Sequence, residues 1–273
     1  MKLSFTDRCE IEEEIHGVGS RSTNETSELI ERSLGQFDSE LNRRKECASS
    51  YTKNFLRNVI RISPKASAWE ASSKSSCYLN DPGVRLRFLR CERFFVDKAV
   101  QRFIDFLKFM TELFGDFVSE RPVQLSDFSR EEETALMNSR IQYLPLRDRS
   151  GRRVLCGVGN LNYHLDVLLR YKFSMFQHWV SSEDVETQKK GIVMALWLFD
   201  EPSDTWEKQI RPNIKKDVMG CHKKQNNAIP VRVTSWQYYY PDTPFFRSTG
   251  TLYLYTQRDS PYRSIYKSHY GTL

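Results

Sequence analysis

The stretch Gly191-Ile-Val-Met-Ala-Leu-Trp-Leu-Phe199 lies between Lys190 and Pro202. None of its side chains is charged, and the indole of Trp197 is the only one that can form a hydrogen bond. An amphipathic helix would show polar residues at every third or fourth position. A strand with one wet face alternates between apolar and polar residues, whereas a strand covered on both faces is apolar throughout. The stretch therefore predicts the central strand of a sheet, with packed layers above and below it.

Length and composition indicate a globular protein with a sizeable core. The chain has 273 residues, six cysteines without a C-x-x-C pair, and a net charge of +6 with both signs mixed. This cysteine pattern favours reduced thiols in the cytoplasm. No apolar run approaches the about 20 residues that cross a bilayer, and the first residues lack the apolar centre of a signal peptide. We expect a soluble, monomeric cytoplasmic protein.

The first part of the chain, residues 1–118, is predicted to be all-helical. Apolar residues recur at helical spacing over about 26–61, and from residue 84 they predict a short helix, a turn and a long helix that ends at Gly115. Cations that could bind phosphate groups lie on the more polar side of the short helix. They could equally form a solvated helix face with their stems along the core. These cations are Arg85, Arg87, Arg90 and Arg93.

The second part, residues 119–273, mixes strands with helices. A hairpin is predicted from 141–146 and 152–158, because Asp148 can cap its turn and Gly151 can adopt a positive φ. The remaining predicted elements are helices over 131–139, 165–180 and 206–222 and strands over 231–240 and 262–271. The fold class is therefore α/β, with an all-helical N-terminal portion beside a mixed sheet that is flanked by helices.

Four motifs in order resemble the CRAL-TRIO family, which includes retinaldehyde- and tocopherol-binding proteins and a phosphatidylinositol transfer protein. They are the segment Leu86-Arg-Phe-Leu-Arg-Cys-Glu-Arg-Phe-Phe-Val-Asp-Lys-Ala99, the hairpin from Arg147 to Val154, the central strand, and the C-terminal segment from Arg263 to Gly271. The resemblance covers about 84–271. Phe95 stands where the family has Asp, and Arg153 where it has Pro. The helical tail that usually ends the family is short or missing here.

The resemblance implies a lipid-binding or lipid-transfer protein whose hydrophobic ligand lies in a cavity closed by a mobile gate, the segment 245–256. It implies transient peripheral association with an anionic membrane surface, through Arg263 and Lys267 beside the gate. The alternative is an interaction or scaffold module of the same fold, with its cavity filled by its own side chains. The implied cavity residues are Leu155, Phe173, Phe176, Val193, Ala195, Trp197, Phe199, Trp236, Tyr238, Phe246, Leu252 and Tyr253.

Catalytic and metal-binding patterns do not occur in the sequence. It contains no P-loop, no H-E-x-x-H and no G-x-S-x-G motif, so we expect neither an enzyme nor a cofactor nor a metal. Cys221 and His222 are adjacent, and on a helix they would point about 100° apart. Trp236, Tyr238 and Tyr240 share one strand face and could stack on bases, but core packing explains them equally well. We therefore do not expect a nucleic-acid partner.

Overall fold

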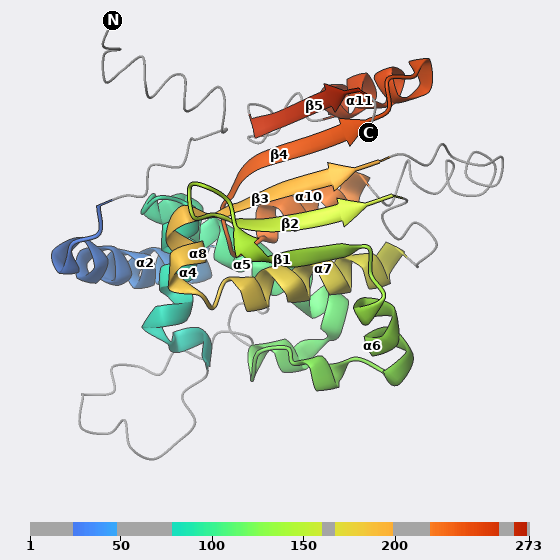
Figure 1. The fold of residues 1–273 in the computed structure, drawn as a ribbon. Coiled ribbons are helices and arrows are strands. Elements are labelled where there is room, and N and C mark those ends of the chain that lie inside the picture. The colour runs from blue at the N-terminus through green and yellow to red at the C-terminus, as the bar shows by residue number, and fades with distance from the viewer. Residues whose placement is uncertain (1–23, 48–77, 160–166, 199–218, 257–264, 272–273) are drawn as a thin grey trace, which may run out of the picture.

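The structure, a computed structural model, describes residues 24–47, 78–159, 167–198, 219–256 and 265–271 (Figure 1). The described chain is of the α/β class, with helices and one five-stranded mixed sheet. The helices are α2 (Ser27–Cys47), α4 (Pro82–Cys91), α5 (Val96–Phe114), α6 (Arg130–Met137), α7 (Val167–Ser181), α8 (Val185–Lys190), α10 (Met219–Ala228) and α11 (Pro244–Thr256). The strands are β1 (Ile141–Arg147), β2 (Arg153–Val158), β3 (Ile192–Trp197), β4 (Val233–Tyr240) and β5 (Tyr266–Tyr270).

The N-terminal helices form because capping residues and apolar spacing agree. Asp81 accepts a hydrogen bond from the Gly83 amide at the start of α4, and Gly115 ends α5 with a φ of 95°. The short helix, turn and long helix are thus confirmed. Of the predicted helix over 26–61, α2 covers the first part, and residues 48–61 lie outside the described chain.

The sheet has the strand order β1-β2-β3-β4-β5, so the predicted central strand lies at its middle. Only the β1–β2 pair is antiparallel. The predicted hairpin is confirmed in detail. The Asp148 carboxylate accepts hydrogen bonds from the backbone amides of Ser150 and Arg152, and Gly151 has a φ of 77°. One carboxylate therefore closes the turn, as its position in the sequence predicts.

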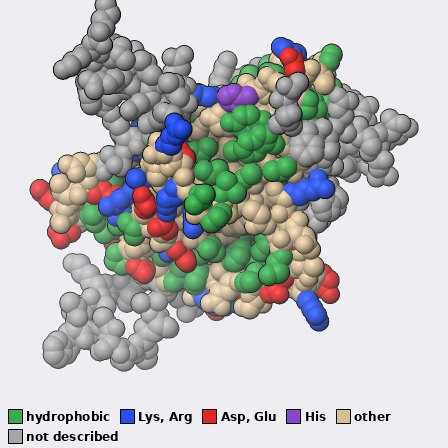
Figure 2. Space-filling model, in the orientation of Figure 1, with side chains coloured by type: hydrophobic (Ala, Val, Ile, Leu, Met, Phe, Trp, Pro, Cys, Tyr) green, Lys and Arg blue, Asp and Glu red, His purple; other side chains and the backbone are tan. Residues whose placement is uncertain are grey.

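Helices of the described chain cover one face of this sheet, and the predicted layer on the other face is not seen among these residues. Met194 and Leu196 belong to the apolar core shared with the helices, whereas Val193, Ala195 and Trp197 point to the opposite face. In Figure 1, α5, α7 and α10 lie behind the sheet, and Figure 2 shows hydrophobic side chains gathered over the strands in front. The reason is topological. Strands in sequential order with right-handed crossovers place their crossover helices on one side.

The predicted helix over 206–222 differs in extent from the observed one. Instead of ending at about His222, α10 continues to Ala228, and residues 206–218 lie outside the described chain. The segment 245–256 is helical although Gly250, Thr251 and Tyr253 have low helix propensity. Among the described helices, none combines the length and the apolar character that crossing a membrane requires.

Candidate functional site

Packing on the sheet holds the poor helical sequence of α11 as a helix, and its hydroxyl groups bond locally to the backbone. At its start, the Thr243 hydroxyl accepts a hydrogen bond from the Phe246 amide over 3.4 Å. Further along, Ser248 donates to the carbonyl of Pro244 and Thr251 donates to the carbonyl of Arg247. These bonds satisfy hydroxyl groups that would otherwise compete with the helix. The helix connects β4 directly to its parallel neighbour β5.

Beneath α11, five aromatic rings stack on the helix-covered face of β4 and β5. The ring of Tyr238 lies 6.5 Å from Trp236 and 5.7 Å from Tyr240, with interplanar angles of 4° and 5°. Tyr266 stacks on Trp236 at 5.0 Å, and Tyr270 stacks on Tyr240 at 5.6 Å. We call these residues the aromatic column. Their spacing of two residues along each strand places all five rings on one face.

The first half of α11 is anchored on the aromatic column. The ring of Phe246 is buried 5.7 Å from that of Tyr240. A Cβ atom at Gly250 would lie 2.1 Å from the Tyr270 hydroxyl oxygen, so only glycine fits this contact as it stands. In the second half, Leu254 and Tyr255 are 39% and 62% exposed. The helix therefore contacts the sheet at one end and presents apolar side chains to solvent at the other.

The close contact at Gly250 predicts a coupled pair of substitutions. Gly250→Ala should lower the free energy of unfolding by about 1 kcal/mol, because overpacking of about 2 kcal/mol exceeds the helix propensity gained by alanine. In a Tyr270→Phe background the hydroxyl is absent and the nearest ring carbon lies 3.2 Å away. There, the same change should stabilise the protein. Denaturant unfolding of the four proteins measures the coupling, and equal effects in both backgrounds would contradict the contact.

The cavity residues implied by the resemblance do not surround one space. Leu155, Trp236 and Tyr238 face the helices, and Val193, Ala195 and Trp197 face the opposite way, because neighbouring residues of a strand alternate. A cavity lined by both groups is therefore excluded. Phe199 and Arg263 lie outside the described chain, and the side chains of Leu252 and Tyr253 in α11 are not described.

The implied cavity residues on the helix-covered side of the sheet do not lie together either. Phe173 and Phe176 of α7 lie 5.8 and 5.1 Å from the ring of Phe128, on the side of the core below β1. Leu155 is on β2 and is also remote from α11. Of the implied residues with described side chains, the structure thus brings together at α11 only Trp236, Tyr238 and Phe246.

Lys267, the implied membrane contact, lies on the sheet face opposite α11. It pairs with Gln237, whereas Tyr266 before it faces the helices. On this opposite face Trp197, Tyr239 and His269 form a second stack, with ring distances of 4.6 and 4.8 Å. Burial, and then the charge of Lys267, lowers the pKa of His269. The contacts on this face are thus separate from those of the gate helix.

Residues missed by the sequence analysis complete the site at α11. Gly250, Tyr266 and Tyr270 provide the close contact and part of the aromatic column, and Arg247 lies 5.2 Å above the ring of Tyr270. Arg247 is 61% exposed and pairs with Asp242, whose pKa it lowers. The alternation of Tyr266 and Tyr270 along their strand was the available signal. Their contact with α11 needed the tertiary structure.

The four arginines of the α4 region are mostly engaged inside the protein. Arg85 pairs with Asp38, Arg87 lies 4.4 Å from the ring of Trp179, and Arg90 pairs with Glu25. Burial of Arg87 lowers the pKa of its guanidinium group. Arg85, Arg87 and Arg90 therefore stabilise the fold through internal contacts and do not form the predicted solvated helix face. Arg93 alone among the four has no side-chain partner in the described residues.

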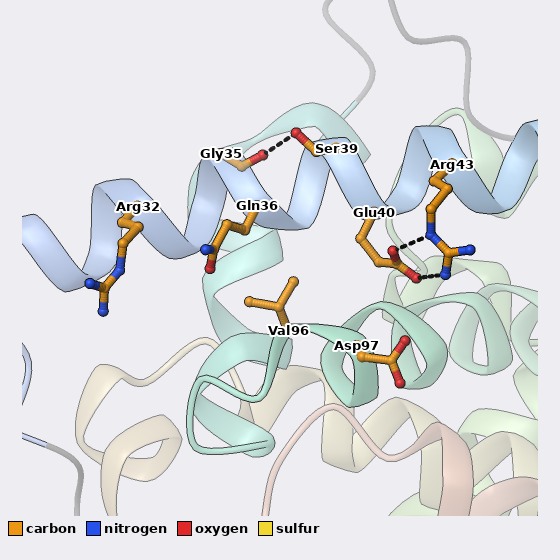
Figure 3. Close-up of a pocket in the computed structure, with 8 residues that line it drawn as sticks. All are labelled: Arg32, Gly35, Gln36, Ser39, Glu40, Arg43, Val96 and Asp97. Atoms are coloured by element: carbon orange, nitrogen blue, oxygen red, sulfur yellow. Dashed lines mark hydrogen bonds and ion pairs between the residues drawn. The ribbon is translucent and has the colours of Figure 1, made fainter.

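A groove of about 720 Å³ lies between α2 and the first turn of α5 (Figure 3). It is open to solvent, and its walls carry both charges. Glu40 accepts two hydrogen bonds from Arg43, and these, with those from Arg44, lower its pKa to about 2. None of the implied cavity residues lines it. The lining residues are Arg32, Gly35, Gln36, Ser39, Glu40, Arg43, Val96 and Asp97.

A buried polar network between β1 and α7 contains the one fully buried histidine of the described chain. Nδ1 of His178 lies 2.8 Å from the Tyr143 hydroxyl, which also accepts a hydrogen bond from Ser181. Burial lowers the pKa of His178 to about 4 and raises that of Tyr143. The network has no route to solvent at His178, whose exposure is 0%. No group of three or more potential metal ligands occurs in the described residues.

Comparison with known proteins identified no relative of this chain. No protein-family model matches the sequence, and no curated protein matches it either. The resemblance to the CRAL-TRIO family therefore depends on the four sequence motifs alone.

Proposed function

We propose that the protein binds a lipid or a similar hydrophobic ligand against the aromatic column, with α11 as the gate. The observation that carries the proposal is a helix packed on the aromatic column by its first half, with exposed apolar side chains in its second half. Phe246 and Gly250 hold its first half on the column, while Leu254 and Tyr255 in its second half are exposed. The CRAL-TRIO resemblance supports the same arrangement, because it implies a gate in this segment.

The energetics of an acyl chain require such a gate. A chain of about 16 carbons gains more than 10 kcal/mol when it leaves water completely, at about 0.8 kcal/mol per CH₂ group. Contact with an open surface would cover only about half of the chain, and the cost of association would offset most of that gain. A soluble carrier must therefore enclose its ligand. Displacement of α11 from Tyr240 and Tyr270 would expose the aromatic column as an apolar wall for it.

Membrane contact would favour this displacement. Tyr255 and Leu254 can insert at the interface, and Arg247 at the start of α11 can meet anionic headgroups at about 1 kcal/mol per basic residue. This assigns to Arg247 the role that the resemblance gave to Arg263 and Lys267. The protein would then associate peripherally with the cytoplasmic surface of a membrane.

Native mass spectrometry of protein purified from cells tests the proposal. We expect co-purifying lipid in the wild type and a several-fold loss of it in Phe246→Ala, which removes the anchor of α11. Ala195→Trp is the matched control, because Ala195 faces the opposite side of the sheet, and its loading should not change. Circular dichroism confirms that each variant is folded.

The alternative outcomes separate the candidate functions. Loss of lipid in Ala195→Trp with normal loading in Phe246→Ala would place the ligand on the opposite face. No lipid in the wild type, and no thermal shift with a panel of lipids, would reject lipid binding. The interaction module would then be favoured, for which the half-buried stack of Trp197 and Tyr239 offers a surface.

A further inference from the structure

Three parallel strands begin side by side at the edge of the sheet opposite to α11. Arg153, Ile192 and Val233 are paired in register, so the residues before them, Arg152, Gly191 and Arg232, form a row at this edge. The packing is close. The Ile192 amide donates to the carbonyl of Arg232 over 2.9 Å, and a Cβ atom at Gly191 would lie 2.6 Å from that oxygen. The backbone of Arg232 is therefore fixed against the start of β3.

The turn between α4 and α5 reaches the same edge. The Cys91 thiol lies 3.8 Å from the carbonyl of Ile229, and Arg102 donates to that carbonyl over 3.3 Å. These contacts hold the turn against the chain that enters β4. Arg93 lies within the turn, with a φ of 52°, which places it in the left-handed region that side chains seldom adopt. The turn thus brings an arginine close to the row of strand starts.

Two of the three arginines here, Arg93 and Arg232, have no acidic partner among the described residues. Arg152 is paired with Asp148, but Arg232 donates only to the carbonyl of Lys189, and its Nε atom is buried without a partner in the described residues. Arg93 has no side-chain partner there either. Burial first, and then the charges of Arg93 and Arg152, lower the pKa of Arg232 to about 10. Among the described residues, no carboxylate forms an ion pair with Arg93 or Arg232.

We infer that Arg93 and Arg232 form a binding site for a phosphate group. Leaving a buried N–H donor unpaired is costly, and an anion between the two arginines would satisfy it. Guanidinium groups match the oxygens of phosphate with paired hydrogen bonds, and a doubly charged anion offsets two cations. The phosphate group can belong to a soluble compound or to a lipid headgroup. The site lies at the edge of the sheet away from α11 and does not depend on the proposed lipid cavity.

Calorimetry with inorganic phosphate tests the site on the full chain at constant ionic strength. The wild type should bind, and Arg93→Gln should bind about tenfold more weakly, as expected for the loss of one charge-assisted contact. Arg93 is exposed and makes no other side-chain contact, so this variant should fold. Arg232→Lys keeps the charge but loses the paired geometry and should also bind more weakly. Arg43→Gln removes an equal charge from a 61% exposed arginine on α2 and should bind as the wild type does.

Flotation with vesicles distinguishes the two sources of phosphate. Phosphatidylcholine vesicles with phosphatidic acid should bind the wild type better than Arg93→Gln if the ligand is a headgroup, and pure phosphatidylcholine should show no difference. Phosphate binding without this preference indicates a soluble ligand. Equal phosphate affinity in Arg93→Gln and Arg43→Gln, or no wild-type binding to either probe, would overturn the inference. Lipid loading of Arg93→Gln, measured by native mass spectrometry, should stay normal, which separates this site from the gate.

Discussion

Replacing Gly191 by alanine is expected to lower the free energy of unfolding by about 3 kcal/mol, enough to unfold a marginal domain. Gly191 has a φ of 82° and a ψ of −167°, an extended positive-φ conformation that is nearly exclusive to glycine and costs a residue with a Cβ atom about 1–3 kcal/mol. The new Cβ atom would also lie 2.6 Å from the Arg232 carbonyl oxygen and 2.7 Å from Cγ2 of Thr234. Because one of these atoms is backbone in the neighbouring strand, relief requires β3 and β4 to separate.

A matched substitution isolates the effect of this contact. Gly115 ends α5 with a φ of 95°, and a Cβ atom there would meet nothing within 4 Å. Its ψ of −176° places it in the same region as Gly191, so Gly115→Ala should show only the conformational cost, about 1–3 kcal/mol. Denaturant unfolding of both variants gives the comparison. If the two changes cost the same, the strand contact at Gly191 contributes nothing.

Acid should destabilise the protein through His178. The ring is fully buried, and its pKa is lowered from 6.5 to about 4 in the folded state. In the unfolded chain the ring takes up a proton near pH 6.5, so the unfolded state binds more protons between pH 6.5 and 4. Stability is therefore complete above pH 6.5 and falls as the pH drops toward 4. One pKa unit corresponds to about 1.4 kcal/mol, which makes the total loss about 3 kcal/mol.

The pH dependence can be assigned to His178 by substitution. His178→Asn keeps an acceptor for the Tyr143 hydroxyl but cannot titrate, so its stability should be flat between pH 6.5 and 4.5. Lowered carboxylate pKa values, such as that of Glu40, add their own loss only below about pH 4.5. His269 is partly exposed and serves as the control. His269→Gln should retain most of the pH dependence of the unfolding free energy. A wild-type curve that is flat from pH 6.5 to 4.5 would contradict the burial of a neutral His178.

Local patterns of the sequence predict much of the fold. The apolar stretch around Met194 becomes the central strand, Asp148 and Gly151 form the expected turn, and Gly115 ends the long helix as its position indicates. Each of these features depends on residues within a few positions of one another. Spacing and φ preferences therefore suffice to predict them.

Contacts between distant segments decide the candidate site. The sequence shows that Trp236, Tyr238 and Tyr240 share a face, but not that Tyr270 stacks on Tyr240 or that Gly250 lies against it. Likewise, the four arginines in and just after α4 look equivalent in the sequence. Only the packing of the chain engages three of them internally and leaves Arg93 exposed in the turn.

The amino-acid sequence by itself determined the α/β class, the central strand and the hairpin, because these depend on the periodicity and turn preferences of adjacent residues. Only the tertiary structure decided which face of the sheet the helices cover. The two faces of a fully apolar strand have the same composition, so the sequence does not indicate which face the helices cover. The handedness and the order of the crossovers place the helices on one side. Ala195 and Trp236 are equally buried for this reason, yet they belong to opposite faces of the sheet.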